Sequence, residues 1–183
     1  MISPSPGGDS IYPPTYPPTF EAAFGYLIQN EGGLASDSAD SGGVTKYGIT
    51  RAEFPDIDIP SLTLDQARSI YYSRPPKGSP LPFWVPNYSL IRDARVATKI
   101  FDMAVNMGPG TTHEIVQLSV GMRNPTQVFG AITLGIVNKA DPASLLDELA
   151  ARAAVHYGEI VAEYPKDIRF LLGWMRRATK VPR

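Results

Sequence analysis

The sequence of 183 residues contains no cysteine and only 2 histidines, His113 and His156. Without cysteine, the chain forms no disulfide, offers no thiolate nucleophile and builds no cysteine-ligated zinc or iron–sulfur site. Two histidines are also too few for a multi-histidine metal centre. Thiol chemistry and these classes of metal centre are therefore excluded.

Long apolar runs are missing as well. No stretch approaches the roughly 18 consecutive apolar residues that a membrane-spanning helix needs, so we expect no insertion into a membrane. The first ten residues, MISPSPGGDS, contain neither the basic region nor the apolar region of a secretory signal peptide. A role outside the cytoplasm would therefore depend on another component for export or release.

The chain also lacks an excess of charge of one sign. With 17 Lys and Arg against 18 Asp and Glu, its formal net charge is −1, which argues against a nucleic-acid partner. Basic residues nevertheless gather near the C-terminus, where a single acid, Asp167, faces Lys166, Arg169, Arg176, Arg177, Lys180 and Arg183. Such a basic end is typical of a surface that binds an anionic polymer, and equally of a solvated helix end that complements the helix dipole.

Proline is concentrated in residues 1–18, which also carry the tandem repeat Tyr-Pro-Pro-Thr. Proline at this density favours extended polyproline II structure and excludes a helix or a central strand. We therefore expect a flexible tail over residues 1–18 and a folded domain over residues 19–183.

Helical spacing of apolar residues dominates residues 19–183 and predicts a mainly α fold. The glycine-rich stretch near residues 40–50 predicts a small β or loop element, and the prolines of residues 74–89 predict an irregular connection. Capping boxes at Thr63 and Thr111, and the pair Asp141-Pro142, mark helix starts. We expect helices at about residues 19–31, 63–72, 90–107, 111–121 and 141–164, and a last one that carries Phe170, Leu171 and Trp174.

Two acids, Glu31 and Asp40, occupy contrasting surroundings. Glu31 ends an apolar predicted helix, where we expect the helix dipole and neighbours such as Phe24 to raise the pKa of its carboxyl. Asp40 lies in a polar loop rich in Ser and Gly, where we expect it to stay ionised. One protonated and one ionised carboxyl is the arrangement used in glycoside cleavage. A pair of solvated surface acids fits the same pattern.

The sequence around these acids carries further motifs. Phe20-x-x-Ala23-Phe24-x-x-Leu27-Ile28-x-x-Glu31-Gly32-Gly33 is followed by Asp40-Ser-Gly-Gly-Val-Thr-Lys-Tyr-Gly-Ile-Thr50 and then by Leu64-Asp-Gln-Ala67. Later come Ile100-Phe-Asp102-Met-Ala-Val-Asn106-Met-Gly108 and Phe129-Gly130-x-Ile132-Thr133. This succession resembles glycoside hydrolase family 108, the peptidoglycan muramidases of phages and bacteria, together with their companion peptidoglycan-type domain.

The resemblance implies a lysozyme-like helical domain, with a catalytic part over residues 19–89 and a helical peptidoglycan-type part over residues 90–183. It implies Glu31 as the catalytic acid. The spacing of Glu31, Asp40 and Thr45 also resembles the Glu-Asp-Thr triad of phage-type lysozymes, which implies that Asp40 and Thr45 position the attacking water. Tyr47 and Asn106 would line the saccharide cleft, although a packed aromatic ring and a helix-end amide explain them equally well. It implies no metal and no organic cofactor.

Two departures from the family pattern affect this interpretation. Family members usually carry Asp-Pro before the Gly-Gly pair, whereas this chain has Asp40-Ser41, which predicts a looser loop. After Tyr72, the segment from Ser73 to Trp84 replaces an aromatic-rich stretch, which predicts a remodelled wall of the cleft.

The expected activity is hydrolysis of the β-1,4 bond between N-acetylmuramic acid and N-acetylglucosamine in bacterial peptidoglycan. One rival is a lytic transglycosylase, and another is a non-catalytic wall-binding or virion structural protein. We expect a monomer that works as a phage endolysin or virion-associated lysin. It would stay in the host cytoplasm before release to the periplasm or cell wall, with a phage particle, a holin or a secretion system as its partner.

Overall fold

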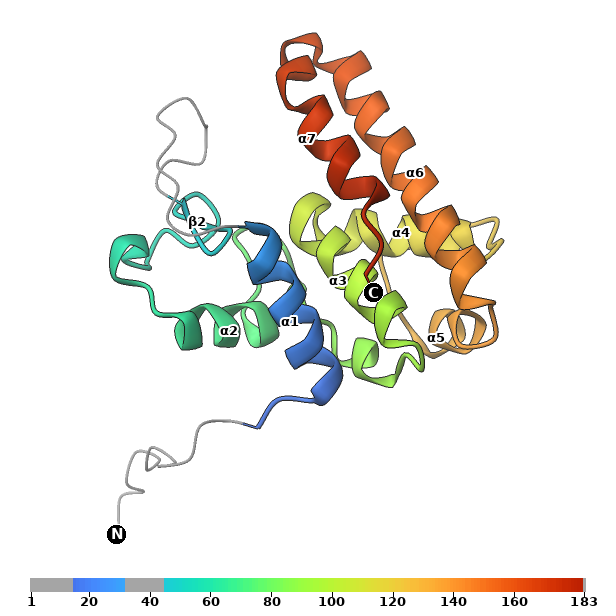
Figure 1. The fold of residues 1–183 in the computed structure, drawn as a ribbon, viewed down its shortest axis with the longest axis horizontal. Helices are drawn as coiled ribbons and strands as arrows, with labels where there is room; N and C mark the ends of the chain where they lie inside the picture. Colours follow the sequence, from blue (N-terminus) through green and yellow to red (C-terminus); the bar gives the residue numbers. More distant parts are fainter. Residues whose placement is uncertain (1–14, 32–44, 183) are drawn as a thin grey trace, which may run out of the picture.

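The computed structural model describes residues 15–31 and 45–182, and within them the predicted mainly α fold is confirmed (Figure 1). A two-stranded antiparallel sheet forms the small β element that was expected near residues 40–50. The α-helices are α1 (Pro18–Glu31), α2 (Leu64–Ser73), α3 (Ala94–Met107), α4 (Pro109–Ser119), α5 (Ala131–Val137), α6 (Pro142–Glu163) and α7 (Ile168–Thr179). The strands are β1 (Thr45–Lys46) and β2 (Ile49–Thr50), and short 3-10 helices are η1 (Ile59–Ser61), η2 (Pro86–Leu90) and η3 (Pro165–Asp167).

Helix α1 lies between two parts of the molecule (Figure 1). The β1–β2 hairpin and α2 lie on one side, and α3 to α7 lie on the other. Helix α1 packs against α3, and α6 packs along α7 in a helical hairpin that extends away from the rest of the molecule. None of the helices in the described ranges combines the length and the apolar character that a bilayer crossing needs.

One aromatic cluster joins the two parts. The ring centroid of Phe101 in α3 lies 5.9 Å from those of Phe20 and Tyr71 and 5.4 Å from that of Trp84. All four side chains are buried, and the rings meet edge to face, the favourable geometry for aromatic pairs. The residues predicted as a catalytic part and as a helical part thus share a core, and the boundary between them at residue 90 stays a prediction.

Tyr16, in the expected tail, packs against this core. Its ring centroid lies 5.3 Å from that of Phe20 and 5.0 Å from that of Tyr72. The contact fixes the chain just before α1 begins at Pro18. The rest of the expected tail, residues 1–14, lies outside the described residues.

Two helix starts agree closely with the sequence. At α2 the Thr63 side chain accepts from the Gln66 backbone N–H at 3.2 Å, and the Gln66 side chain accepts from the Thr63 N–H at 2.8 Å, which completes the predicted capping box. At α6 the Asp141 carboxylate accepts from the Ser144 N–H at 2.9 Å, with Pro142 at the first helical position. Both caps are local, so the sequence contains all the information they need.

Other helix starts differ from the predictions. Helix α3 begins at Ala94 rather than near Leu90, because Asp93 caps it. Helix α4 begins at Pro109, after Gly108 in the left-handed region (φ 82°), so the capping box predicted at Thr111 is wrong. Helix α5, of 7 residues, was not predicted.

Buried polar side chains of α4 hold the segment before α5. The Gln117 side chain donates to the Val128 carbonyl at 2.7 Å and to the Thr133 hydroxyl at 3.1 Å. His113 Nδ1–H donates to the Gln127 carbonyl at 2.8 Å, which leaves Nε2 to accept from the Tyr88 hydroxyl at 2.7 Å. Burial lowers the pKa of His113 below its ordinary 6.5, so the ring is neutral at pH 7.

Candidate active site

The predicted catalytic acid is placed by helix α1, which ends at Glu31. Buried Phe20, Phe24 and Leu27 fix the helix against the core. The backbone therefore brings Glu31 to the end of a firmly packed helix, as the apolar spacing predicted. The Glu31 side chain and all of Asp40 lie outside what the structure describes, so their roles stay predictions.

Thr45 and Tyr47 belong to the β1–β2 hairpin. Thr45 pairs with Thr50 and Lys46 pairs with Ile49, so Tyr47 and Gly48 form a two-residue turn. Both turn residues have positive φ, 55° for Tyr47 and 79° for Gly48, as a type I′ turn requires. Glycine adopts this region freely, but a bulky aromatic residue is strained there.

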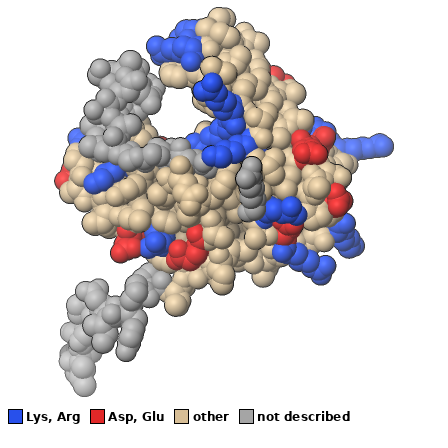
Figure 2. All heavy atoms as spheres, viewed as in Figure 1, with Lys and Arg blue, Asp and Glu red and all other residues tan. Residues whose placement is uncertain are grey.

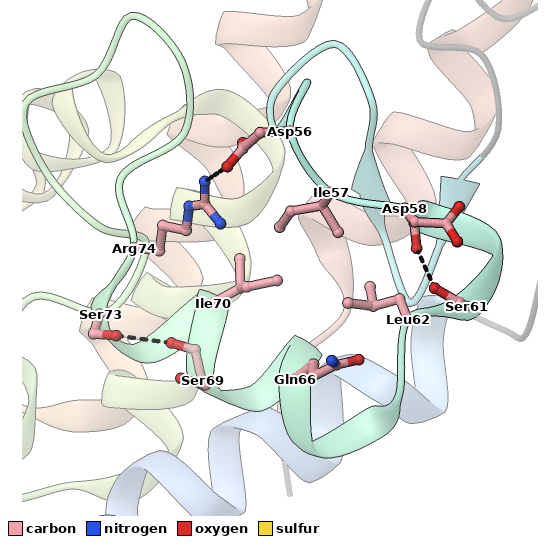
Figure 3. Close-up of a pocket in the computed structure, with 10 residues that line it drawn as sticks. All are labelled: Asp56, Ile57, Asp58, Ser61, Leu62, Gln66, Ser69, Ile70, Ser73 and Arg74. Atoms are coloured by element: carbon pink, nitrogen blue, oxygen red, sulfur yellow. Dashed lines mark hydrogen bonds and ion pairs between the residues drawn. The ribbon is translucent and has the colours of Figure 1, made fainter. Parts of the chain in front are cut away.

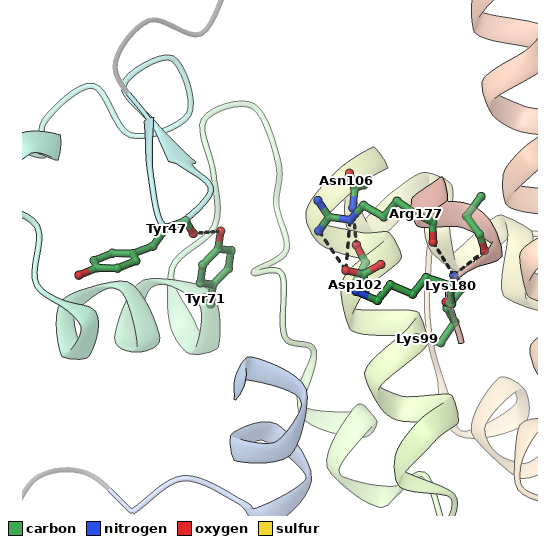
Figure 4. Close-up of polar contacts among 8 residues, drawn as sticks. Tyr47, Tyr71, Lys99, Asp102, Asn106, Arg177 and Lys180 are labelled. Atoms are coloured by element: carbon green, nitrogen blue, oxygen red, sulfur yellow. Dashed lines mark hydrogen bonds and ion pairs between the residues drawn. The ribbon is translucent and has the colours of Figure 1, made fainter. Parts of the chain in front are cut away.

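The strain at Tyr47 has a compensating contact (Figure 4). The buried Tyr71 side chain of α2 donates from its hydroxyl to the Tyr47 carbonyl at 2.8 Å. The Tyr47 ring is half-buried, and the Lys46 ammonium lies 5.6 Å from its centroid. Tyr71 thus supports the strained backbone at Tyr47, and the contact of Tyr47 with the saccharide stays a prediction.

Short-range bonds fix the rest of the hairpin. The Lys46 ammonium donates to the Pro60 carbonyl at 2.9 Å, which ties β1 to η1. The Thr50 hydroxyl donates to the Glu53 carboxylate at 2.9 Å, and the Glu53 backbone N–H donates back to that hydroxyl at 3.2 Å. These bonds tie the hairpin that carries Thr45 to residues at most 14 positions further along the chain.

Asn106 lies on the other side of α1, in the last turn of α3 (Figure 4). Its side-chain amide donates to the Asp102 carbonyl one turn earlier, at 2.9 Å. The buried Asp102 carboxylate accepts from Arg177 of α7 at 3.0 Å and 3.2 Å. Figure 4 shows Asn106 grouped with Arg177 and separate from Tyr47, so the two predicted saccharide contacts come from different parts of the fold.

Lys99 anchors the end of α7, a role that sequence reasoning did not predict. Its side chain is fully buried, and its ammonium donates to the carbonyls of Arg177, Ala178 and Lys180 at 3.1, 2.6 and 3.0 Å. Carbonyls at a helix C-terminus lack helical partners, so a lysine satisfies them well. Burial lowers the pKa of Lys99 to about 8, which leaves the ammonium predominant at pH 7.

Comparison with known proteins identifies the family. Residues 24–108 match the family described as Glycosyl hydrolase 108. The chain contains a glycosyl hydrolase family 108 domain. This confirms the resemblance seen in the sequence and makes the chain a glycosidase, with the peptidoglycan-degrading, lysozyme-like activity that the family implies. The match includes every predicted site residue: Glu31, Asp40, Thr45, Tyr47 and Asn106.

The fold of the chain is similar to that of SagA from Brucella abortus. The two chains are 24% identical and superpose with a TM-score of 0.58, over 87% of this chain and 93% of the other. At that identity the likeness shows a shared fold and no more. Among curated proteins, none matches the chain.

Two cavities in the described part of the chain have none of the predicted site residues in their lining. The first, of about 380 Å³, lies between the irregular connection at residues 78–81 and the α3–α4 corner at residues 107–111. It begins at Met107, directly after Asn106, and its lining includes Leu81 of the segment that departs from the family pattern. This placement is compatible with the prediction that the Ser73–Trp84 segment forms a remodelled wall.

The second cavity, of about 480 Å³, lies between α2 and the loop that precedes it (Figure 3). Ile57, Leu62 and Ile70 supply its apolar lining, and Asp56 and Asp58 lie at its edge. Arg74 pairs with Asp56, and this hydrogen bond lowers the pKa of the Asp56 carboxyl. No motif in the sequence pointed to this cavity, because its lining residues are ordinary loop and helix residues brought together by folding.

Proposed function

We propose that this chain hydrolyses the β-1,4 bond between N-acetylmuramic acid and N-acetylglucosamine, with Glu31 as the general acid. The observation that carries the proposal is the family match over residues 24–108, which spans all the predicted site residues. The geometry of the described part supports it, because α1 ends at Glu31 and the hairpin begins at Thr45.

The chemistry needs a proton for the leaving oxygen and a water molecule on the opposite face of the sugar. Glu31 supplies the proton, since an acid at a helix C-terminus has its ionised form disfavoured. Asp40 and Thr45 orient the water, and Tyr47 offers a ring face to a sugar. In this mechanism every reacting group comes from the chain itself, and the helical part supplies the opposite wall through Asn106.

The test compares the wild type with Glu31→Gln on purified sacculi, with mass spectrometry of the soluble products. Glu21→Gln serves as the matched control, because Glu21 is an exposed acid at the other end of the same helix. We expect wild type and Glu21→Gln to release muropeptides with reducing N-acetylmuramic acid, and Glu31→Gln to lose at least about 10³-fold in rate.

The products also decide between the alternatives. Products that end in anhydromuramic acid would show that the chain is a lytic transglycosylase and not a hydrolase. Full activity of Glu31→Gln would overturn the assignment of Glu31 as the general acid. Binding to sacculi without soluble products from any variant would favour a wall-binding protein. Delivery to the wall, as a phage endolysin or on a virion, stays a prediction.

A further inference from the structure

The outer face of α7 combines exposed basic side chains in a regular row. Trp174 stacks on Tyr157 of α6 with ring centroids 5.2 Å apart, and Arg177 turns to Asp102 of α3, so these side chains define the packed face. Arg169 and Arg176 are exposed. They are seven residues apart, two helical turns, so they project from the same face about 10 Å apart along the axis.

Lys180 extends this row toward α1. It follows the last turn of α7, and its ammonium lies 5.7 Å from the ring centroid of Tyr26 in α1. Tyr26 precedes Glu31 by five residues, about 7 Å along the helix axis. The basic row, defined here as Arg169, Arg176 and Lys180, therefore runs along α7 and ends beside the helix that carries the predicted catalytic acid.

The charged side chains along α7 are of one sign (Figure 2). Lys and Arg side chains lie along α7, with no Asp or Glu among them in this view. Within residues 15–31 and 45–182, no acidic side chain forms an ion pair with Arg169 or Arg176. The acids nearest in sequence, Glu163 and Asp167, lie at the turn between α6 and α7.

The row is held in place from the interior. Lys99 binds three carbonyls at the end of α7, and Asp102 binds Arg177, so the helix cannot rotate without breaking both anchors. The Arg169 guanidinium lies 4.6 Å from the Phe170 ring centroid, and neither it nor Arg176 has a carboxylate partner among the described residues. Guanidinium groups without a carboxylate partner on a fixed helix form a site for carboxylates, which Arg binds with two parallel hydrogen bonds.

We infer that the basic row binds the carboxylates of the stem peptides on the glycan strand, and so selects peptide-bearing substrate. The inference rests on the proposed function, because it takes peptidoglycan as the substrate. The amino sugars of the strand carry no charge, so the anionic groups of this polymer are the carboxylates of its lactyl-linked peptides. Exposed Leu172, between Arg169 and Arg176, adds apolar surface for the peptide.

The experiment compares two substrates that differ in charge alone. Soluble peptide-bearing strands with acetylated amines are used either as such or after conversion of their carboxyls to amides. We expect wild type to show a kcat/KM about fivefold higher on the carboxylate form, as two or three exposed ion pairs would provide. Arg169→Gln/Arg176→Gln, which keeps only Lys180 of the row, should remove most of this preference by lowering kcat/KM on the carboxylate strands much more than on the amidated strands.

The matched control is Arg123→Gln/Lys139→Gln, which removes two exposed positive charges elsewhere on the chain. It should keep the preference. Equal turnover of both substrates by wild type, or equal loss on both substrates in the α7 variant, would overturn the inference.

Binding separates this inference from the proposed function. Fluorescence anisotropy with labelled strands is measured for Glu31→Gln with and without the two α7 substitutions. Weaker binding of the carboxylate strands alone, on removal of the two arginines, supports the basic row even if the chain cleaves nothing. Unchanged binding refutes it whatever the catalytic result.

Discussion

The β1–β2 hairpin and α7 lie on opposite sides of α1, and they are held in place in different ways. The hairpin is fixed by bonds that span 3 to 24 residues of sequence, which join Thr50 to Glu53, Lys46 to Pro60 and Tyr71 to Tyr47. Helix α7 is fixed by Lys99 and Asp102, which lie 75 to 81 residues before the groups they bind. The bonds that hold the hairpin thus span much shorter stretches of sequence than the two side chains on which the position of α7 depends.

The largest expected effect comes from removing the long-range anchor of α7. Lys99→Met keeps the length of the side chain but leaves three carbonyls without their donor, at a cost of about 2–4 kcal/mol in the free energy of unfolding. Urea unfolding at pH 7 measures it. Lys139→Met, an exposed lysine, is the control and should change stability by less than about 0.5 kcal/mol. Similar stability of both variants would show that α7 does not need this anchor.

The second anchor should have a smaller effect. Asp102→Asn removes the charge opposite Arg177 but keeps an oxygen acceptor, so we expect a loss of about 1–3 kcal/mol. Asp147→Asn, on the exposed face of α6, is the matched control. If the basic row matters for the substrate, Asp102→Asn should also reduce the preference for carboxylate strands. An unchanged preference would show that the row keeps its position without this ion pair.

A third effect should appear only at acidic pH. His113 is neutral in the fold and its pKa is lowered, so the unfolded chain takes up a proton below about pH 6.5 while the folded chain does not. The stability contributed by the neutral ring is present above pH 6.5 and is lost as pH falls toward the lowered pKa. Thermal unfolding from pH 7.5 to 5 measures the slope.

His113→Gln should flatten this slope relative to the wild type, whereas His156→Gln, at a half-buried position in α6, should keep it. An identical slope in all three proteins would assign the acid sensitivity to other groups. The pH dependence would also distinguish two sources of stability: His113, which holds the segment before α5, and Lys99, which holds α7.

The sequence predicted those parts of the fold whose causes are local. The Thr63 capping box and the Asp141-Pro142 start appear in the structure as predicted, because a cap needs only four consecutive residues. The start of α4 was misplaced, since Gly108-Pro109 ends one helix and begins the next, and a glycine-proline pair usually signals only the end. Helix α5 was missed, because it is short and is held by Gln117 of α4.

The candidate site shows the same division. The motif around Glu31 and Thr45 pointed to family 108 and to the residues that the family match now spans. The bonds between the buried acid Asp102 and Arg177, 75 residues later, were not foreseen. Nor was the anchoring role of Lys99, because a lysine in an amphipathic helix usually faces water and only the folded arrangement brings α7 over it.

The smallest expected effect on stability comes from Tyr47 in the hairpin, which has a strained backbone and is also predicted to contact the saccharide. Asn tolerates positive φ far better than Tyr, so Tyr47→Asn should relieve the turn and change the free energy of unfolding by less than about 1 kcal/mol. If the ring contacts the saccharide, the same substitution should lower kcat/KM on sacculi about fivefold or more, since a stacked ring contributes about 1 kcal/mol or more. Tyr47→Phe, which keeps the ring and the strain, should keep most of the activity. A Tyr47→Asn protein with full activity would mean that Tyr47 is a turn residue alone, and the hairpin would then contribute to the site through Thr45.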